Sequence, residues 1–212
     1  ADDVQGQAIL AKLKGRRLPM VGRVEVSIIE EIQPRWLAFL SNETDLSFRM
    51  PTEFANMAIP NNELAPNLKK LGIEMTQVPA LDLTFAYFNM EDPTVGGYTP
   101  DKVALRRAIT LGYRTRDEIS VIWKNQAVLA HTPYSPGVAG YDPEFRTTAN
   151  EYNTSKAKAL LDMYGYIDRD GDGYREMPDG SPLLLKFNST PTARDQQIDE
   201  LMNKFLADKL SD

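Results

Sequence analysis

Two short runs of alternating apolar and polar residues flank an apolar helical stripe, and this arrangement limits the folds open to the chain. Residues 24–29 read Val-Glu-Val-Ser-Ile-Ile, a β-branched alternation typical of a half-buried strand. Pro34 follows at a place where the first turn of a helix tolerates proline, and residues 36–40 supply the apolar stripe. A second extended run covers residues 44–49. Strand, helix and strand in this order predict a βαβ unit and an α/β fold.

The rest of the chain continues the alternation of helices with extended segments. Thr99 is expected to cap a helix, because Pro100 suits the first turn and Asp101 complements the helix dipole. Asn153 or Thr154 is expected to cap another helix. Arg106 and Arg107 are expected on a solvated helix face. The patterns predict further helices over residues 4–14, 52–58, 116–124, 156–164 and 193–210, and extended chain over 73–90 and 183–187.

Composition removes several classes of function. The 212 residues contain no cysteine and one histidine, which excludes thiolate metal sites and leaves any Ser-His-Asp triad dependent on His131. The net charge of −6 argues against a nucleic-acid partner, because the phosphate backbone would repel the chain. No apolar run approaches the roughly 18 residues that a membrane span needs.

Residues 130–143 are too rich in proline and glycine for regular structure, and they contain the single histidine. His131 could serve as a general base or a ligand anchor, because loops often carry functional residues. It could equally be a partly exposed loop residue without a role. Tyr87 and Asn89 could line a cleft, or the aromatic residues could be core and Asn89 could cap a strand end.

An acidic turn at residues 168–173 reads Asp-Arg-Asp-Gly-Asp-Gly, the opening pattern of a calcium loop. The twelfth position is Asp179 rather than the usual bidentate glutamate, and the prolines at 178 and 182 prevent a second helix. The alternative is an ordinary Asp/Gly turn. We therefore expect calcium to be absent or weakly held by the candidate ligands Asp168, Asp170 and Asp172.

Six short motifs occur in a fixed order across nearly the whole chain. They are Leu18-Pro19, Trp36-Leu37-Ala38-Phe39-Leu40 with Glu43-Thr44-Asp45, Tyr87-Phe88-Asn89, Leu105-Arg106-Arg107-Ala108-Ile109, the loop 137–143, and Ala157-Lys158-Ala159-Leu160-Leu161. With these motifs in this order, the chain resembles the family 5 extracellular solute-binding proteins, which are the peptide, dipeptide and nickel receptors of ABC importers. Arg114-Thr115 stands where many relatives carry an Asp-Arg pair, which indicates a subfamily with different local packing.

The resemblance implies a segment of a periplasmic-binding-protein-like fold of type II, with two lobes, mixed sheets and flanking helices. It assigns residues 1–84 to the end of the first lobe, 85–98 to the crossing between lobes, and 99–212 to a second lobe that is incomplete here. The family's chains are more than twice this length, so we expect an internal fragment. Residues 18–90 should then pack more loosely than residues 99–210.

The resemblance also implies the substrate-binding component of an ABC transporter, which captures a peptide-like solute in the cleft between its lobes. Such a protein is exported to the periplasm or the cell exterior, free or membrane-associated, with its signal peptide removed. It is a monomer that works with membrane permease subunits and has no enzymatic activity. No cofactor is expected, except for the possible calcium at the acidic turn. The candidate ligand-binding residues are Tyr87, Asn89, His131 and Tyr134. The alternatives are a secreted metal-dependent hydrolase and a calcium-stabilised structural domain.

Overall fold

The computed structural model describes residues 3–17, 19–48 and 50–210, and its internal contacts divide the chain into two compact units. The first unit, residues 1–51, contains α1 (Val4–Leu13) and α2 (Ile32–Leu40). In this unit Asp3 caps α1 by accepting a hydrogen bond from the Gly6 N–H at 2.8 Å, and Trp36 of α2 is buried. The lobe boundaries predicted at residues 84 and 99 differ from this division after residue 51, and they stay a prediction.

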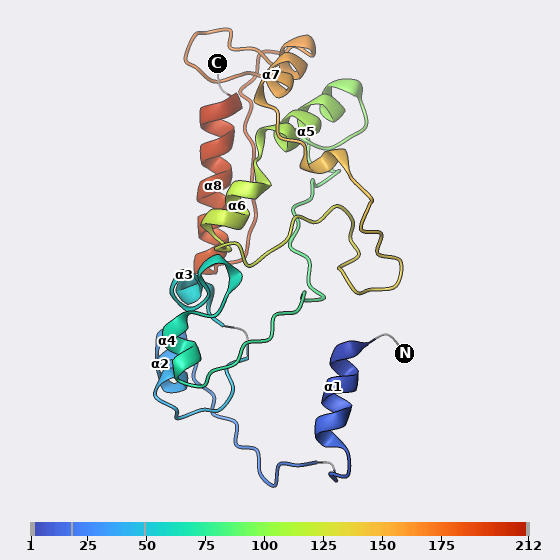
Figure 1. The fold of residues 1–212 in the computed structure, drawn as a ribbon. Coiled ribbons are helices and arrows are strands. Elements are labelled where there is room, and N and C mark those ends of the chain that lie inside the picture. The colour runs from blue at the N-terminus through green and yellow to red at the C-terminus, as the bar shows by residue number, and fades with distance from the viewer. Residues whose placement is uncertain (1–2, 18, 49, 211–212) are drawn as a thin grey trace. The chain divides into compact units, whose positions relative to one another are not determined.

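The second unit, residues 52–212, holds the remaining helices of the described chain (Figure 1). Short turns come first, and four longer helices follow the connection at 71–99. The elements are η1 (Thr52–Phe54), α3 (Ala55–Ala58), η2 (Pro60–Asn62), α4 (Pro66–Lys70), α5 (Pro100–Gly112), α6 (Thr115–Val121), η3 (Thr148–Asn150), α7 (Thr154–Met163) and α8 (Ala193–Leu210).

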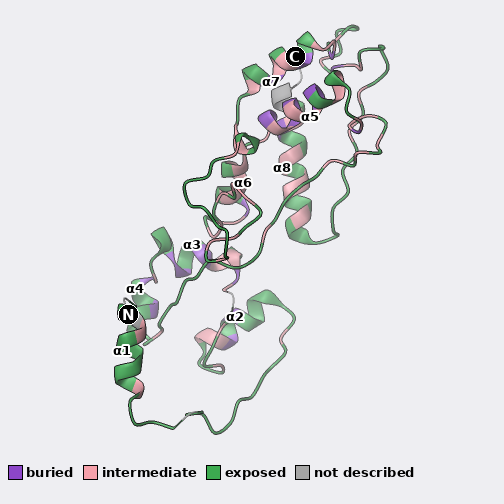
Figure 2. Ribbon diagram, turned by 90° about the vertical axis from the view of Figure 1, so that its right-hand side faces the viewer, coloured by how far each residue is buried: buried purple, intermediate pink, exposed green. Residues whose placement is uncertain are grey.

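The core of the second unit lies where α5 packs against α7 and α8. Leu105 and Leu111 of α5, Leu161 of α7 and Tyr166 just after α7 are almost fully buried, and Figure 2 shows the buried faces of α5 and α7. The Tyr166 hydroxyl donates to the Asp101 carbonyl at 3.2 Å, and burial raises the pKa of Tyr166 to about 12. The helical stripes predicted from sequence therefore form one apolar core within residues 99–210.

The two arginines of α5 bind neighbouring loops instead of lying on a solvated face. Arg106 donates to the carbonyls of Val95 and Gly97 at 2.5 and 2.9 Å. Arg107 pairs with Glu151 at 2.8 Å and also donates to a carbonyl of η3. The expectation of a solvated pair is wrong, because the turn before α5 and the segment before α7 bring oxygen acceptors to this helix.

The predicted strands do not form among the described residues, and the expected mixed sheet is not found there. The β pairing that the structure records is a single antiparallel bridge between Glu176 and Pro182. In the first unit Val26 is 83% exposed and Phe48 is 81% exposed, and no strand is recorded over the described residues of the two alternating runs. A strand needs hydrogen bonds from a neighbouring strand, and nothing in the described chain supplies them. Leu18 and Arg49 lie outside the described residues.

Two predicted helix caps have different outcomes. The Asn153 side chain accepts a hydrogen bond from the Lys156 N–H at 2.9 Å, which confirms it as the cap of α7. Thr99 precedes α5 as expected, but its side chain does not cap the helix. A hydrogen bond from Thr99 instead lowers the pKa of Asp101.

None of the described helices is long and apolar enough to cross a membrane.

Candidate functional site

The proline- and glycine-rich segment between α6 and α7 forms a hollow of about 450 Å³, here called the loop hollow. Glycines at 137 and 140 adopt positive φ of 88° and 91°, and side-chain oxygens close the turns before and after them. Thr132 Oγ1 accepts from the Tyr134 N–H at 2.9 Å, and Asp142 Oδ1 accepts from the Glu144 N–H at 2.8 Å. The residues that line the loop hollow include His131, Pro133, Tyr134, Asp142, Phe145 and Thr147.

His131 has a fixed orientation in this hollow. Its Nδ1 accepts a hydrogen bond from the Thr147 N–H at 3.4 Å, so a neutral ring carries its proton on Nε2. The side chain of Asn150 also donates to the carbonyl of Ala130, the residue before His131, at 2.5 Å. His131 is therefore positioned by backbone contacts, with Nε2–H available as a donor.

Tyr134 lines the loop hollow together with His131. Its side chain is 53% exposed, and Phe145 supplies a second aromatic face. Asp142 adds a carboxylate. Aromatic surfaces combined with a few hydrogen-bonding groups are typical of sites for small organic ligands.

The structure does not bring Tyr87 and Asn89 into the loop hollow. Tyr87 is 82% exposed, and its ring lies against Phe85 with centroids 6.2 Å apart. The Asn89 side chain accepts from the Glu91 N–H at 3.1 Å, so it stabilises the turn that leads to α5. Their part in ligand binding stays a prediction.

The acidic turn brings together four carboxylates within the described chain. Ligand oxygens of Asp168, Asp170, Asp172 and Glu176 all lie within 4.8 Å of one another. Glycine N–H groups at 171 and 173 donate to the two oxygens of Asp168 at 2.7 and 2.8 Å. These hydrogen bonds, the one from Gly173 above all, lower the pKa of Asp168 and keep it ionised. A cluster of carboxylate oxygens of this kind suits a hard cation.

Comparison with known proteins places the chain in a family. The pattern described as bacterial extracellular solute-binding proteins, family 5 Middle, matches residues 8–210. The chain belongs to this family of solute-binding proteins. No curated protein gives a significant match to this family 5 chain.

Solved structures similar to this family 5 chain include two of a periplasmic oligopeptide-binding protein of an oligopeptide ABC transporter from Thermotoga maritima. The mannohexaose-bound structure is 24% identical, with 56% of this chain and 23% of that chain covered and a TM-score of 0.45. The other is 19% identical, with 84% of this chain and 37% of that chain covered and a TM-score of 0.48. The family 5 chain thus spans less than half the length of either.

Sequence reasoning missed two features of this family 5 chain. Glu176 was not considered as a ligand, although it occupies the ninth position of the calcium-loop pattern, where a ligand often lies. A second hollow, lined by side-chain amides, was also missed. Two asparagines after Pro60 and an Asn125-Gln126 pair after α6 were the available signals, but their proximity depends on tertiary structure.

Proposed function

We propose that this chain is part of the substrate-binding component of an ABC transporter and helps to capture a peptide-like solute. The match of the solute-binding family over residues 8–210 carries this proposal. The loop hollow supports it, because His131 and Tyr134 offer a hydrogen-bond donor and an aromatic face beside each other. The role is binding rather than catalysis, in the periplasm or at the cell exterior, and membrane permease subunits are the proposed partners.

The whole protein is proposed to have two lobes with mixed sheets, a solute being held between the lobes. A ligand that contacts both lobes favours the closed population, because it binds that state more tightly. The exposed alternating run at residues 24–29 supports this architecture, since its apolar side chains need a partner layer. Tyr87 and Asn89, at the predicted crossing between lobes, are proposed to contact the solute.

Tyr134→Ala is expected to weaken peptide binding about tenfold, which corresponds to ~1.4 kcal/mol, because tyrosine contributes both contact area and a hydroxyl. The measurement is a calorimetric titration with a pool of di- to pentapeptides. Tyr98→Ala is the matched control, since Tyr98 is 83% exposed and does not line the loop hollow. Equal binding by the two variants would contradict the proposal, as would peptide hydrolysis that His131→Ala abolishes.

We also propose that calcium stabilises the acidic turn, because Glu176 adds a fourth carboxylate to the three aspartates. Calcium ligands lie roughly 2.3–2.6 Å from the ion, so two oxygens of one shell can be up to roughly 5.2 Å apart. The ligand oxygens of the cluster all lie within 4.8 Å of one another, which satisfies this limit. A divalent cation would also relieve the repulsion among four carboxylates.

Millimolar calcium is expected to raise the melting temperature by about 2–4 °C, the shift that ~1 kcal/mol produces in a chain of this size. Asp170→Asn should remove this effect, because it takes away one charged ligand. Asp82→Asn, an identical change at an exposed position outside the cluster, should leave it intact. Thermal unfolding with calcium and with EDTA measures the shift. An unchanged melting temperature would show that calcium does not stabilise the turn.

A further inference from the structure

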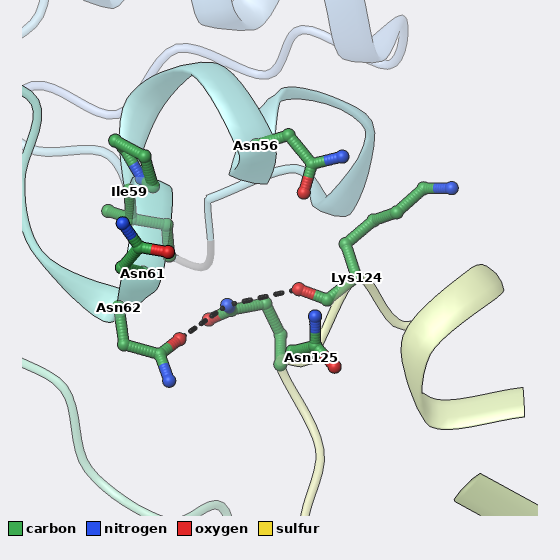
Figure 3. A pocket seen from close by; sticks show the side chains of 8 residues that line it. Asn56, Ile59, Asn61, Asn62, Lys124 and Asn125 are labelled. Atoms are coloured by element: carbon green, nitrogen blue, oxygen red, sulfur yellow. Dashed lines mark hydrogen bonds between the residues drawn. The ribbon is translucent and has the colours of Figure 1, made fainter. Parts of the chain in front are cut away.

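A second hollow, of about 390 Å³, lies between residues 56–62 and residues 124–126, and is here called the amide hollow (Figure 3). Its volume falls within the roughly 300–1,000 Å³ typical of small-molecule sites. Ile59 and Pro60 form its apolar part, and neither a carboxylate nor an aromatic ring belongs to the lining. Side-chain amides dominate the remainder, at Asn56, Asn61, Asn62, Asn125 and Gln126, and Lys124 completes the lining.

The backbone around the amide hollow is in an unusual conformation. Five non-glycine residues of the described chain have positive φ, and four of them line this hollow. Asn61 and Asn62 have φ of 56° and 62° on one side, and Lys124 and Asn125 have φ of 49° and 61° on the other. Left-handed backbone is unfavourable at non-glycine residues, less so at asparagine, and is concentrated at ligand-binding sites.

Gln126 connects the two sides of the amide hollow. Its Nε2 donates to Asn62 Oδ1 at 3.2 Å, and its Oε1 accepts from Gln77 Nε2 at 3.2 Å. Its amide is therefore occupied by contacts within the protein. The side-chain amides of Asn56, Asn61 and Asn125 make no hydrogen bond within the described part of the chain. In Figure 3 these three side chains surround the open space between the two turns.

We propose that the amide hollow binds the main chain of a short peptide. Each free amide has both a donor and an acceptor, as has each peptide unit, so the two can pair without any charge. The absence of a carboxylate from the lining disfavours a cation as ligand. Sugar hydroxyls share this donor and acceptor chemistry, and the experiment below distinguishes a peptide ligand from a sugar ligand. The proposal rests on the proposed function, since it assigns a second contact region for the same class of solute.

The test is an NMR titration of the 212-residue chain with acetyl-trialanine amide, an uncharged peptide, and in parallel with maltotriose. The peptide should shift the side-chain NH₂ signals of Asn61 and Asn125 in a saturable manner. The double variant Asn61→Gly and Asn125→Gly should weaken peptide binding at least tenfold. Glycine accepts the positive φ at both positions, so the backbone is retained while the amides are removed.

Asn42→Gly is the matched control, because Asn42 also has positive φ, at 61°, but lies outside the amide hollow. This variant should bind the peptide as the original chain does. Saturation by maltotriose without saturation by the peptide would overturn the proposal. So would peptide binding that the double variant retains, or unmoved NH₂ signals at Asn61 and Asn125. If the His131 signals shift while these NH₂ signals do not, this proposal fails and the proposed function stands.

Discussion

Leu105→Ala is expected to lower the free energy of unfolding by about 3 kcal/mol, in the usual range for a leucine deleted from a packed core. Leu105 is 1% exposed in the cluster that joins α5 to α7. The loss combines the transfer free energy of the removed atoms with the cost of a cavity. For a domain whose total stability is about 5–15 kcal/mol, this is a large fraction of the free energy of unfolding.

Denaturant unfolding monitored by circular dichroism measures this change. Val103→Ala is the control, because Val103 lies on the same helix and is 47% exposed. Its substitution should cost much less than that of Leu105. Equal losses in the two variants would show that the α5 face at Leu105 is not packed as described.

Arg175→Ala should destabilise the second unit by about 2 kcal/mol, because it leaves a buried carbonyl without its charged donor. The Arg175 side chain is 3% exposed and donates to the Tyr166 carbonyl at 2.6 Å and to Asp162 at 2.5 Å. The Asp162 side chain is 56% exposed. Asp162→Ala should therefore cost less than about 1 kcal/mol, since solvent screens its charge.

Thermal and denaturant unfolding of both variants distinguishes these contributions. Arg116→Ala, at an exposed arginine of α6, should change the free energy of unfolding by about 0.5 kcal/mol or less. A loss in Asp162→Ala as large as that in Arg175→Ala would mean that the ion pair, rather than the bond to the Tyr166 carbonyl, dominates.

Helices were predictable from the sequence because their hydrogen bonds lie within one segment. The predicted helix over 193–210 coincides with α8, and the Thr99-Pro100 signal gives the start of α5. The predicted strands needed partners that no local pattern can supply, so Val26 and Phe48 remain exposed. The expectation that residues 18–90 pack more loosely than residues 99–210 stays a prediction.

The candidate sites depended on tertiary structure to different extents. His131 and Tyr134 lie close together in sequence and line one hollow, and their part in ligand binding stays a prediction. Glu176 joins the acidic turn, where its Oε2 accepts a hydrogen bond from the Arg169 N–H at 2.7 Å. The amide hollow combines residues more than sixty positions apart, and pairing at that distance cannot be seen in a single sequence.

The most direct test of solute capture uses the single histidine of the chain. His131 contributes the only imidazole signal, so a proton NMR titration with a pool of short peptides follows one unambiguous probe inside the loop hollow. Peptide binding is predicted to shift the His131 ring signals saturably, and Tyr134→Ala should weaken this response. Unchanged ring signals at peptide concentrations that bind the chain would contradict the account.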